Sequence, residues 1–137
     1  MDISGIINAF FTVIGSPYHM MLILIAIPVG LIFGAVPGLG GKLAIVMCIP
    51  FVFGMDPIPG AIFLLAMHSI VHTGGALPGI LFGVPGTGAD AATIVDGLPM
   101  TKKGEAGRAM GASLFASGIG GIIGAMFLLG VLPILRP

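Results

Sequence analysis

Charged side chains are scarce in this sequence. Its 137 residues include only five lysines and arginines and five aspartates and glutamates, so charges make up 7% of the chain. Soluble domains carry roughly a quarter of their residues as charges. Mean hydropathy is +1.20 and 57% of the residues are hydrophobic. This composition predicts an integral membrane protein.

Three further absences exclude other classes. Formal net charge is zero, so the basic footprint of a nucleic-acid-binding protein is missing and we expect no nucleic-acid partner. Cys48 is the only cysteine, which rules out an internal disulfide. The apolar run that begins at Ile3 is preceded by Asp2 and not by a basic residue. This argues against a cleaved signal peptide.

Two long stretches of the sequence contain no charged residue: Pro57 to Ala89 and Ala109 to Leu135. About 20 apolar residues cross the hydrocarbon, so each can hold a membrane span. The apolar stretch from Ile3 to Ile14 is too short to span, and we expect residues 1–15 to form an interfacial helix.

Two polar residues stand directly before prolines and predict helix starts. Ser16 precedes Pro17, and Asp56 precedes Pro57. A serine or aspartate oxygen can accept a hydrogen bond from an exposed backbone N–H of the first helical turn. Proline has no backbone N–H, and the first helical position has no partner for one. We predict one helix from Pro17 towards residue 36 and another from position 57 to about residue 82.

Nearly identical sequences interrupt the apolar runs twice, V-P-G-L-G at 36–40 and V-P-G-T-G at 84–88. The apolar stretch after the first, Leu43 to Gly54, is too short for a span of its own and contains Pro50. It is therefore expected to be half of a broken crossing or part of a re-entrant hairpin. The predicted fold class is all-α: a polytopic membrane helix bundle with broken or re-entrant helices at two Pro-Gly loops, forming a single integral membrane domain over residues 1–137.

Most of the charges gather after the second interruption, in a polar loop over residues 87–108. We predict a short helix there from Ala89 to Val95, ended by Gly97 and Pro99. After residue 100 the basic residues outnumber the acidic one, which favours the cytoplasmic side for this loop: Lys102, Lys103 and Arg108 against Glu105.

Small residues recur at every fourth position in several apolar runs, a spacing that lets helices approach closely. They are Gly30, Gly34 and Gly38 in the first run, Gly79 and Gly83 in the third, and Ala109, Ser113, Ser117, Gly121 and Ala125 in the last. We expect a tightly packed bundle with partners.

Unwound backbone in hydrocarbon needs protein or a water-filled cavity to satisfy its N–H and C=O groups. In broken transporter helices, helix N-termini face an anion and freed carbonyls hold a cation. The two interruptions therefore predict a carboxylate-binding cavity lined by Pro37, Gly38, Gly40, Lys42, Pro85, Gly86, Thr87 and Gly88. The alternative is that both are interfacial turns and that Lys42 only reaches to the interface.

Asp90, Thr93 and Asp96 follow the second interruption in steps of three, and their oxygens suit a coupling cation such as sodium. The alternatives are a helix cap for Asp90 and a turn residue for Asp96. His68 and His72 share a helix face without a third ligand, so we expect no metal site there. They either hydrogen-bond inside the bundle or carry protons near the cavity.

Four blocks of the sequence resemble the TctA family, the large membrane subunit of tripartite tricarboxylate transporters. They are G-A-V-P-G-L-G at 34–40, A-I-V-M-C-I-P-F-V-F-G-M-D-P at 44–57, G-G-A-L-P-G-I-L-F-G-V-P-G-T at 74–87 and D-G-L-P-M-T-K-K-G-E-A-G-R-A-M-G at 96–111. Family members are much longer, so the chain resembles the N-terminal portion of such a permease. Lys42 stands where the family often has a small or hydroxyl residue, and residues 72–76 depart from a common Y-G-G-S-type stretch.

The resemblance implies a multi-pass permease of the bacterial inner membrane that takes up citrate-like di- or tricarboxylates. Sodium or protons would drive uptake, a periplasmic solute-binding protein would deliver the substrate, and a small membrane subunit and the rest of the permease would be partners. No cofactor is implied. No catalytic constellation stands in the sequence, so we expect no enzyme. The alternative function is a structural or accessory membrane protein whose small-residue faces serve only helix association.

Overall fold

The computed structural model of the chain describes residues 3–135, and the regular elements in this part are all helices. They are α1 Ile3–Gly15, α2 Pro17–Ala35, α3 Gly40–Val52, α4 Pro57–Phe82, the 3-10 turn η1 Gly88–Asp90, α5 Ala91–Lys102 and α6 Ala106–Leu135. Three helices are long and apolar enough to cross a membrane: α2, α4 and the Ala106–Val131 part of α6. The predicted all-helical membrane fold is thus confirmed at this level, and the interfacial position of α1 stays a prediction.

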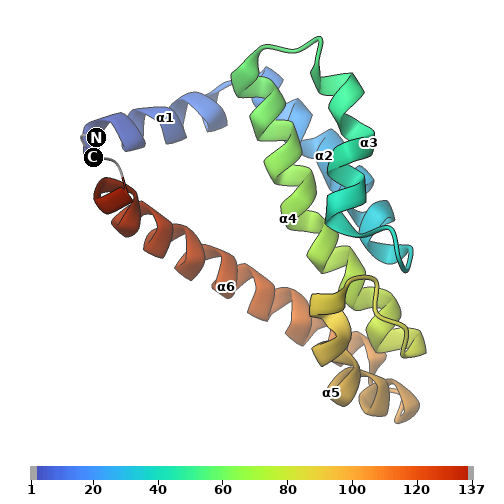
Figure 1. Ribbon diagram of the computed structural model, residues 1–137. Coiled ribbons are helices and arrows are strands. Elements are labelled where there is room, and N and C mark those ends of the chain that lie inside the picture. The colour runs from blue at the N-terminus through green and yellow to red at the C-terminus, as the bar shows by residue number, and fades with distance from the viewer. Residues whose placement is uncertain (1–2, 136–137) are drawn as a thin grey trace.

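Helices α2 and α4 lie side by side and run in the same direction, with α3 returning between their ends (Figure 1). Gly30 of α2 packs on Met67 of α4, and Gly34 packs one turn further along on Val71. The order is reversed for α3, whose start lies beside His68 and whose end lies beside Gly60. The α2–α3 pair is therefore a hairpin, and the alternative of two halves of one broken crossing is wrong.

Glycines bring the backbones of α2 and α4 into direct contact. A Cβ on Gly30 would lie 2.6 Å from the carbonyl oxygen of Met67, and a Cβ on Gly74 would lie 2.7 Å from that of Leu31. A Cβ on Gly34 would collide with the carbonyl oxygen of Val71. The predicted close-contact spacing holds for Gly30 and Gly34, whereas Gly38 lies beyond the helix and has no neighbour within 4 Å. The buried core beside this contact consists of Ala26, Ala44, Cys48, Phe63, Met67 and Val71.

Both proline-marked helix starts are confirmed, since α2 begins at Pro17 and α4 at Pro57. Neither preceding side chain forms the expected cap hydrogen bond, although both residues have the extended backbone of an N-cap. Proline at the first position lacks one of the N–H groups that the first turn leaves unpaired, so each start has one donor fewer to satisfy. The end of α4 also matches the prediction, because Gly83 stops the helix with a left-handed φ of 74°.

The short helix predicted from Ala89 to Val95 is wrong in extent, because α5 continues through Gly97 and Pro99. Gly97 is buried against α4, where a Cβ would lie 2.7 Å from Cγ1 of Ile80, so this glycine serves packing and not helix termination. One turn later the Thr101 hydroxyl donates to the carbonyl oxygen of Ile80 at 2.8 Å. Contact with α4 therefore overrides the local helix-stop signals.

The stop that α5 uses is Gly104, whose φ is 82°. The N–H groups of Gly104 and Glu105 donate back to the carbonyl oxygens of Thr101 and Met100, each at 2.9 Å. This is the Schellman arrangement, which satisfies the free carbonyls of the last helical turn. A charged Lys-Lys-Gly-Glu turn thus joins α5 to α6.

Helix α6 diverges from the α2–α4 pair and stays exposed along most of its length (Figure 1). Its small-residue face was expected to receive another helix. Within the described part of the chain nothing approaches Gly118, Gly121 or Gly124 within 4 Å. Only the first turns are packed, with Ala109 buried in a small cluster with Ala76 and Ile80.

Replacing Gly34 by alanine tests the backbone contact. Gly34→Ala is expected to lower the free energy of unfolding by about 1–3 kcal/mol, because the added Cβ meets the α4 backbone, which cannot rotate away. Gly5→Ala on α1, where nothing lies within 4 Å, is the matched control and should raise helix stability by about 0.5–1 kcal/mol. Denaturant unfolding in detergent micelles, followed by circular dichroism, measures both. If both variants change the free energy of unfolding in the same direction, the contact between the α2 and α4 backbones is contradicted.

Candidate functional site

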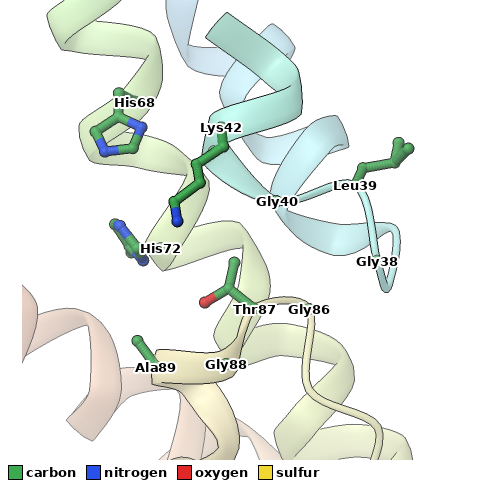
Figure 2. Close-up of a pocket in the computed structure, with 11 residues that line it drawn as sticks. Gly38, Leu39, Gly40, Lys42, His68, His72, Gly86, Thr87, Gly88 and Ala89 are labelled. Atoms are coloured by element: carbon green, nitrogen blue, oxygen red, sulfur yellow. The ribbon is translucent and has the colours of Figure 1, made fainter. Parts of the chain in front are cut away.

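The two Pro-Gly loops open onto one cavity of about 440 Å³ beside the second half of α4 (Figure 2). The α2–α3 turn and the start of α3 form one wall, the segment after α4 forms another, and α4 itself supplies two histidines. The lining residues are Gly38, Leu39, Gly40, Gly41, Lys42, His68, His72, Gly86, Thr87, Gly88 and Ala89. Segments far apart in sequence thus share one hollow.

The first loop depends on the conformational freedom of glycine. Gly38 and Gly40 have φ values of 89° and 60°, in the left-handed region that other residues rarely enter. Nothing lies within 4 Å of a Cβ at either position, so space is not the constraint. The two glycines reverse the chain so that α3 begins directly after α2 ends.

The second loop needs glycine for a different reason. The N–H of Gly86 donates to the carbonyl oxygen of Gly75 at 3.1 Å. A Cβ on Gly86 would collide with the carbonyl oxygen of Gly34 and lie 2.5 Å from Cα of Gly75. The lack of a side chain at Gly86 therefore lets the loop pack directly on the contact between α2 and α4. The two interruptions have nearly the same sequence and different backbone conformations, so they are not structurally equivalent repeats.

Asp90 holds the second loop from behind the cavity. Its side chain is buried, with 6% exposure, and its Oδ2 accepts from the N–H of Thr87 at 3.1 Å and from the Thr87 hydroxyl at 2.6 Å. The same carboxylate packs on Gly75, where a Cβ would collide with it. Asp90 does not cap α5, to which its side chain makes no cap hydrogen bond. Its carboxylate is the third-residue partner in a capping box with Thr87, and it orders the Thr87 side of the loop.

The three residues predicted to hold a cation do not form one group. The Thr93 hydroxyl donates to the backbone carbonyl oxygen of Asp90 at 2.6 Å, and Asp96 is exposed further along α5. Among the described residues no three histidine, cysteine or acidic side chains come close enough to hold a metal ion. A cation role for these residues stays a prediction.

Most of the predicted substrate residues come together in the cavity: Gly38, Gly40, Lys42, Gly86, Thr87 and Gly88. Pro37 and Pro85 are not among the lining residues, and each directly precedes a glycine that is. The sequence prediction missed Leu39, Gly41 and Ala89, which lie within or beside the loops. It also left His68 and His72 out of the substrate site, although their spacing of four was a signal.

The cavity is basic. Lys42 extends from α3 towards His72, and His68 lies one turn earlier on α4 (Figure 2). The two imidazole rings meet edge to face with centroids 5.5 Å apart. Nδ1 of His68 is buried and has no hydrogen-bond partner among the described residues. No carboxylate of a described residue lines the cavity, so its charge suits an anion.

These features define a multi-pass membrane protein with a basic cavity between two interruptions of its helices. The chain belongs to the tripartite tricarboxylate transporter TctA family, whose profile matches residues 20–137, and this is a transporter family and not an enzyme family. The resemblance found in the sequence is thereby confirmed.

The chain is also similar to an uncharacterized 52.8 kDa protein in the TAR-I ttuC' 3' region of Agrobacterium vitis. The two are 27% identical over 128 residues, which cover 93% of this chain and 26% of the relative. The chain thus spans about a quarter of that relative's length. No solved structure matches this chain.

The contrasting roles of the two loop glycines give a prediction. Gly38→Ala is expected to cost about 1–2 kcal/mol through its left-handed φ, and Gly38→Asn should cost less because asparagine tolerates that region. Gly86→Ala and Gly86→Asn should both cost more, since any Cβ meets backbone. Unfolding midpoints in micelles compare the four variants. If Gly38→Asn is no more stable than Gly38→Ala, the explanation by the left-handed φ of Gly38 is contradicted.

The buried carboxylate gives another prediction. Asp90→Ala is expected to lower stability by about 1–3 kcal/mol, because the Thr87 donors lose their acceptor. Asp90→Asn keeps an oxygen and should lose less. Asp96→Ala is the control and should change stability by no more than about 0.5 kcal/mol, because that side chain is exposed. Equal losses at the two aspartates would show that the Thr87 contact does not order the loop.

Proposed function

We propose that the chain is part of a membrane permease for cation-coupled uptake of citrate-like di- or tricarboxylates, and that its cavity lies on the substrate path. The observation that carries the proposal is the meeting of both Pro-Gly loops on one basic hollow. The family match supports transport as the class of function.

The position of the loops along α4 supports a cavity inside the membrane. Gly75, which Gly86 contacts, lies about 10 Å before the end of α4 at a rise of about 1.5 Å per residue. Helix α4 has 26 residues, enough to cross the hydrocarbon. The α2–α3 hairpin would then be re-entrant, and the peptide groups at both loops would need water or a ligand.

The polar groups of the cavity match a carboxylate. The Lys42 amine supplies a charge, and the first turn of α3 at Gly40 presents backbone N–H groups at the positive end of the helix dipole. The Thr87 hydroxyl on the opposite wall already donates its hydrogen to Asp90. A ligand with several carboxylates could contact both Lys42 and this helix end. Coupling to a cation is part of the proposal, with Asp90, Thr93 and Asp96 as the sequence-based candidates.

The proposed setting is the bacterial inner membrane. A periplasmic solute-binding protein would deliver the substrate, and a small membrane subunit and the remainder of the permease would complete the transporter. The exposed face of α6, with no neighbour at Gly121 or Gly124 among the described residues, is the surface proposed to meet those membrane partners.

The same exposed face favours the second candidate, a structural or accessory membrane protein that associates through small residues. The two candidates differ in which variants matter. Under the accessory function, Gly120→Leu and Gly124→Leu would disturb assembly while Gly38 and Gly86 variants would leave it intact. Under the transport function, bulky residues at positions 38 and 86 would abolish uptake.

Lys42 provides the direct test of the transport function. Lys42→Ala is expected to raise the citrate concentration for half-maximal uptake by about tenfold or more, because an interaction with a charged group is lost. Lys42→Arg should retain more affinity, and Lys102→Ala in the α5–α6 turn is the matched control. Radiolabelled citrate uptake by cells that carry the complete permease measures all three. Unchanged apparent affinity in Lys42→Ala at normal membrane levels would show that the lysine is only an anchor.

A further inference from the structure

We infer that His68 and His72 are the proton-binding groups of the cavity, and that an anion with several carboxylates binds together with a proton taken up by this pair. The inference rests on the proposed function and extends it, since it makes the proton the coupling cation. The observation that carries it is a histidine pair that shares the cavity with Lys42.

The two histidines are placed to exchange protons with the cavity. Both line it, on successive turns of α4, and their ring centroids are 5.5 Å apart. Nδ1 of His68 is buried without a hydrogen-bond partner among the described residues, and it points at Gly41, where a Cβ would lie 2.5 Å away. This nitrogen has no internal bond that fixes its protonation state.

Among the described residues, Lys42 is the lysine, arginine, aspartate or glutamate that lines the cavity beside the pair. From α3 the pair faces Lys42, and from the second loop it faces the uncharged Thr87. From α6 an adjoining hollow brings Leu114 and Ser117 to the His72 side, and neither is charged. Helix α2 has no acidic or basic side chain apart from His19 near its start, and the carboxylate of Asp90 is engaged by Thr87 on the far side of the loop.

An entering anion brings a negative charge next to the pair. A carboxylate in the cavity interacts favourably with each added proton, so anion and proton strengthen each other's binding by the same factor. The pair would thus couple the two ligands without any conformational change.

The same lining is poorly suited to sodium. Hard cations prefer several oxygen ligands, and carboxylates above all. The cavity offers the hydroxyl of Thr87 as its side-chain oxygen, and Lys42 repels a cation at the same place. A proton bound to an imidazole nitrogen needs no such set of oxygen ligands.

The sign of the pH dependence follows directly. Histidine gains its charge as pH falls through the range from about 8 to about 5. Anion affinity should therefore rise as pH falls, by up to about tenfold per pH unit for each proton taken up. At neutral pH we expect about one proton to be taken up per anion bound.

Calorimetry counts these protons. Citrate would be titrated into the full chain, purified with the permease components that accompany it, in two buffers of different ionisation enthalpy at pH 7. The difference in heat gives the protons taken up per citrate. The expected result is net uptake in the wild type that falls by about half or more in His72→Gln and in His68→Gln. His19→Gln, at the only histidine outside the cavity, is the matched control and should leave the uptake unchanged.

The outcomes separate the two levels of the proposal. Citrate binding with wild-type proton uptake in both cavity variants would overturn the histidine assignment and leave the transport function intact. Absence of citrate binding at every pH in the folded wild-type assembly would overturn both. If a variant fails to fold, the imidazole Cε1–H resonances of the wild type decide instead. Two of the three should move when citrate is added at pH 7, and unmoved resonances would contradict the inference.

Discussion

The contact between the backbones of α2 and α4 is the constraint on which the rest of the structure depends. Gly34 and Gly74 remove the side chains that would hold these helices apart, so peptide groups of the two helices touch. Gly86 then packs into the same place and donates its N–H to Gly75. Three segments converge there because no Cβ separates them. A single methyl group at this junction would displace a helix or a loop.

The cavity is a consequence of that junction. The first loop reverses the chain just after Gly34, and the second returns to the same level on α4, so two unwound segments end up on opposite walls. Asp90 fixes one wall through Thr87, and Lys42 and the two histidines line the cavity from α3 and α4. One of the five lysines and arginines of this neutral chain thus lies where an anion could be bound.

Sequence reasoning predicted the helices, the proline-marked starts and the shared place of both loops, because these depend on local chemistry and hydropathy. It failed where tertiary contact decides. Gly97 is a helix stop by local rules and a packing residue beside Ile80 in the fold. The two loops have nearly the same sequence, yet Gly38 serves conformation and Gly86 serves packing, a difference that depends on neighbours outside the motif. The small residues of α6 were likewise expected to pack, yet nothing lies within 4 Å of a Cβ at Gly121 or Gly124 among the described residues.

The most direct test of the account is the proximity of the two loops in the membrane. In a chain carrying Cys48→Ala, which removes the native thiol, Leu39→Cys and Ala89→Cys would be introduced together and treated with a short, water-soluble bifunctional thiol reagent. Both positions line the cavity from different loops, so we predict an intramolecular cross-link that citrate slows. Reaction of each thiol without any cross-link between them would contradict a shared cavity.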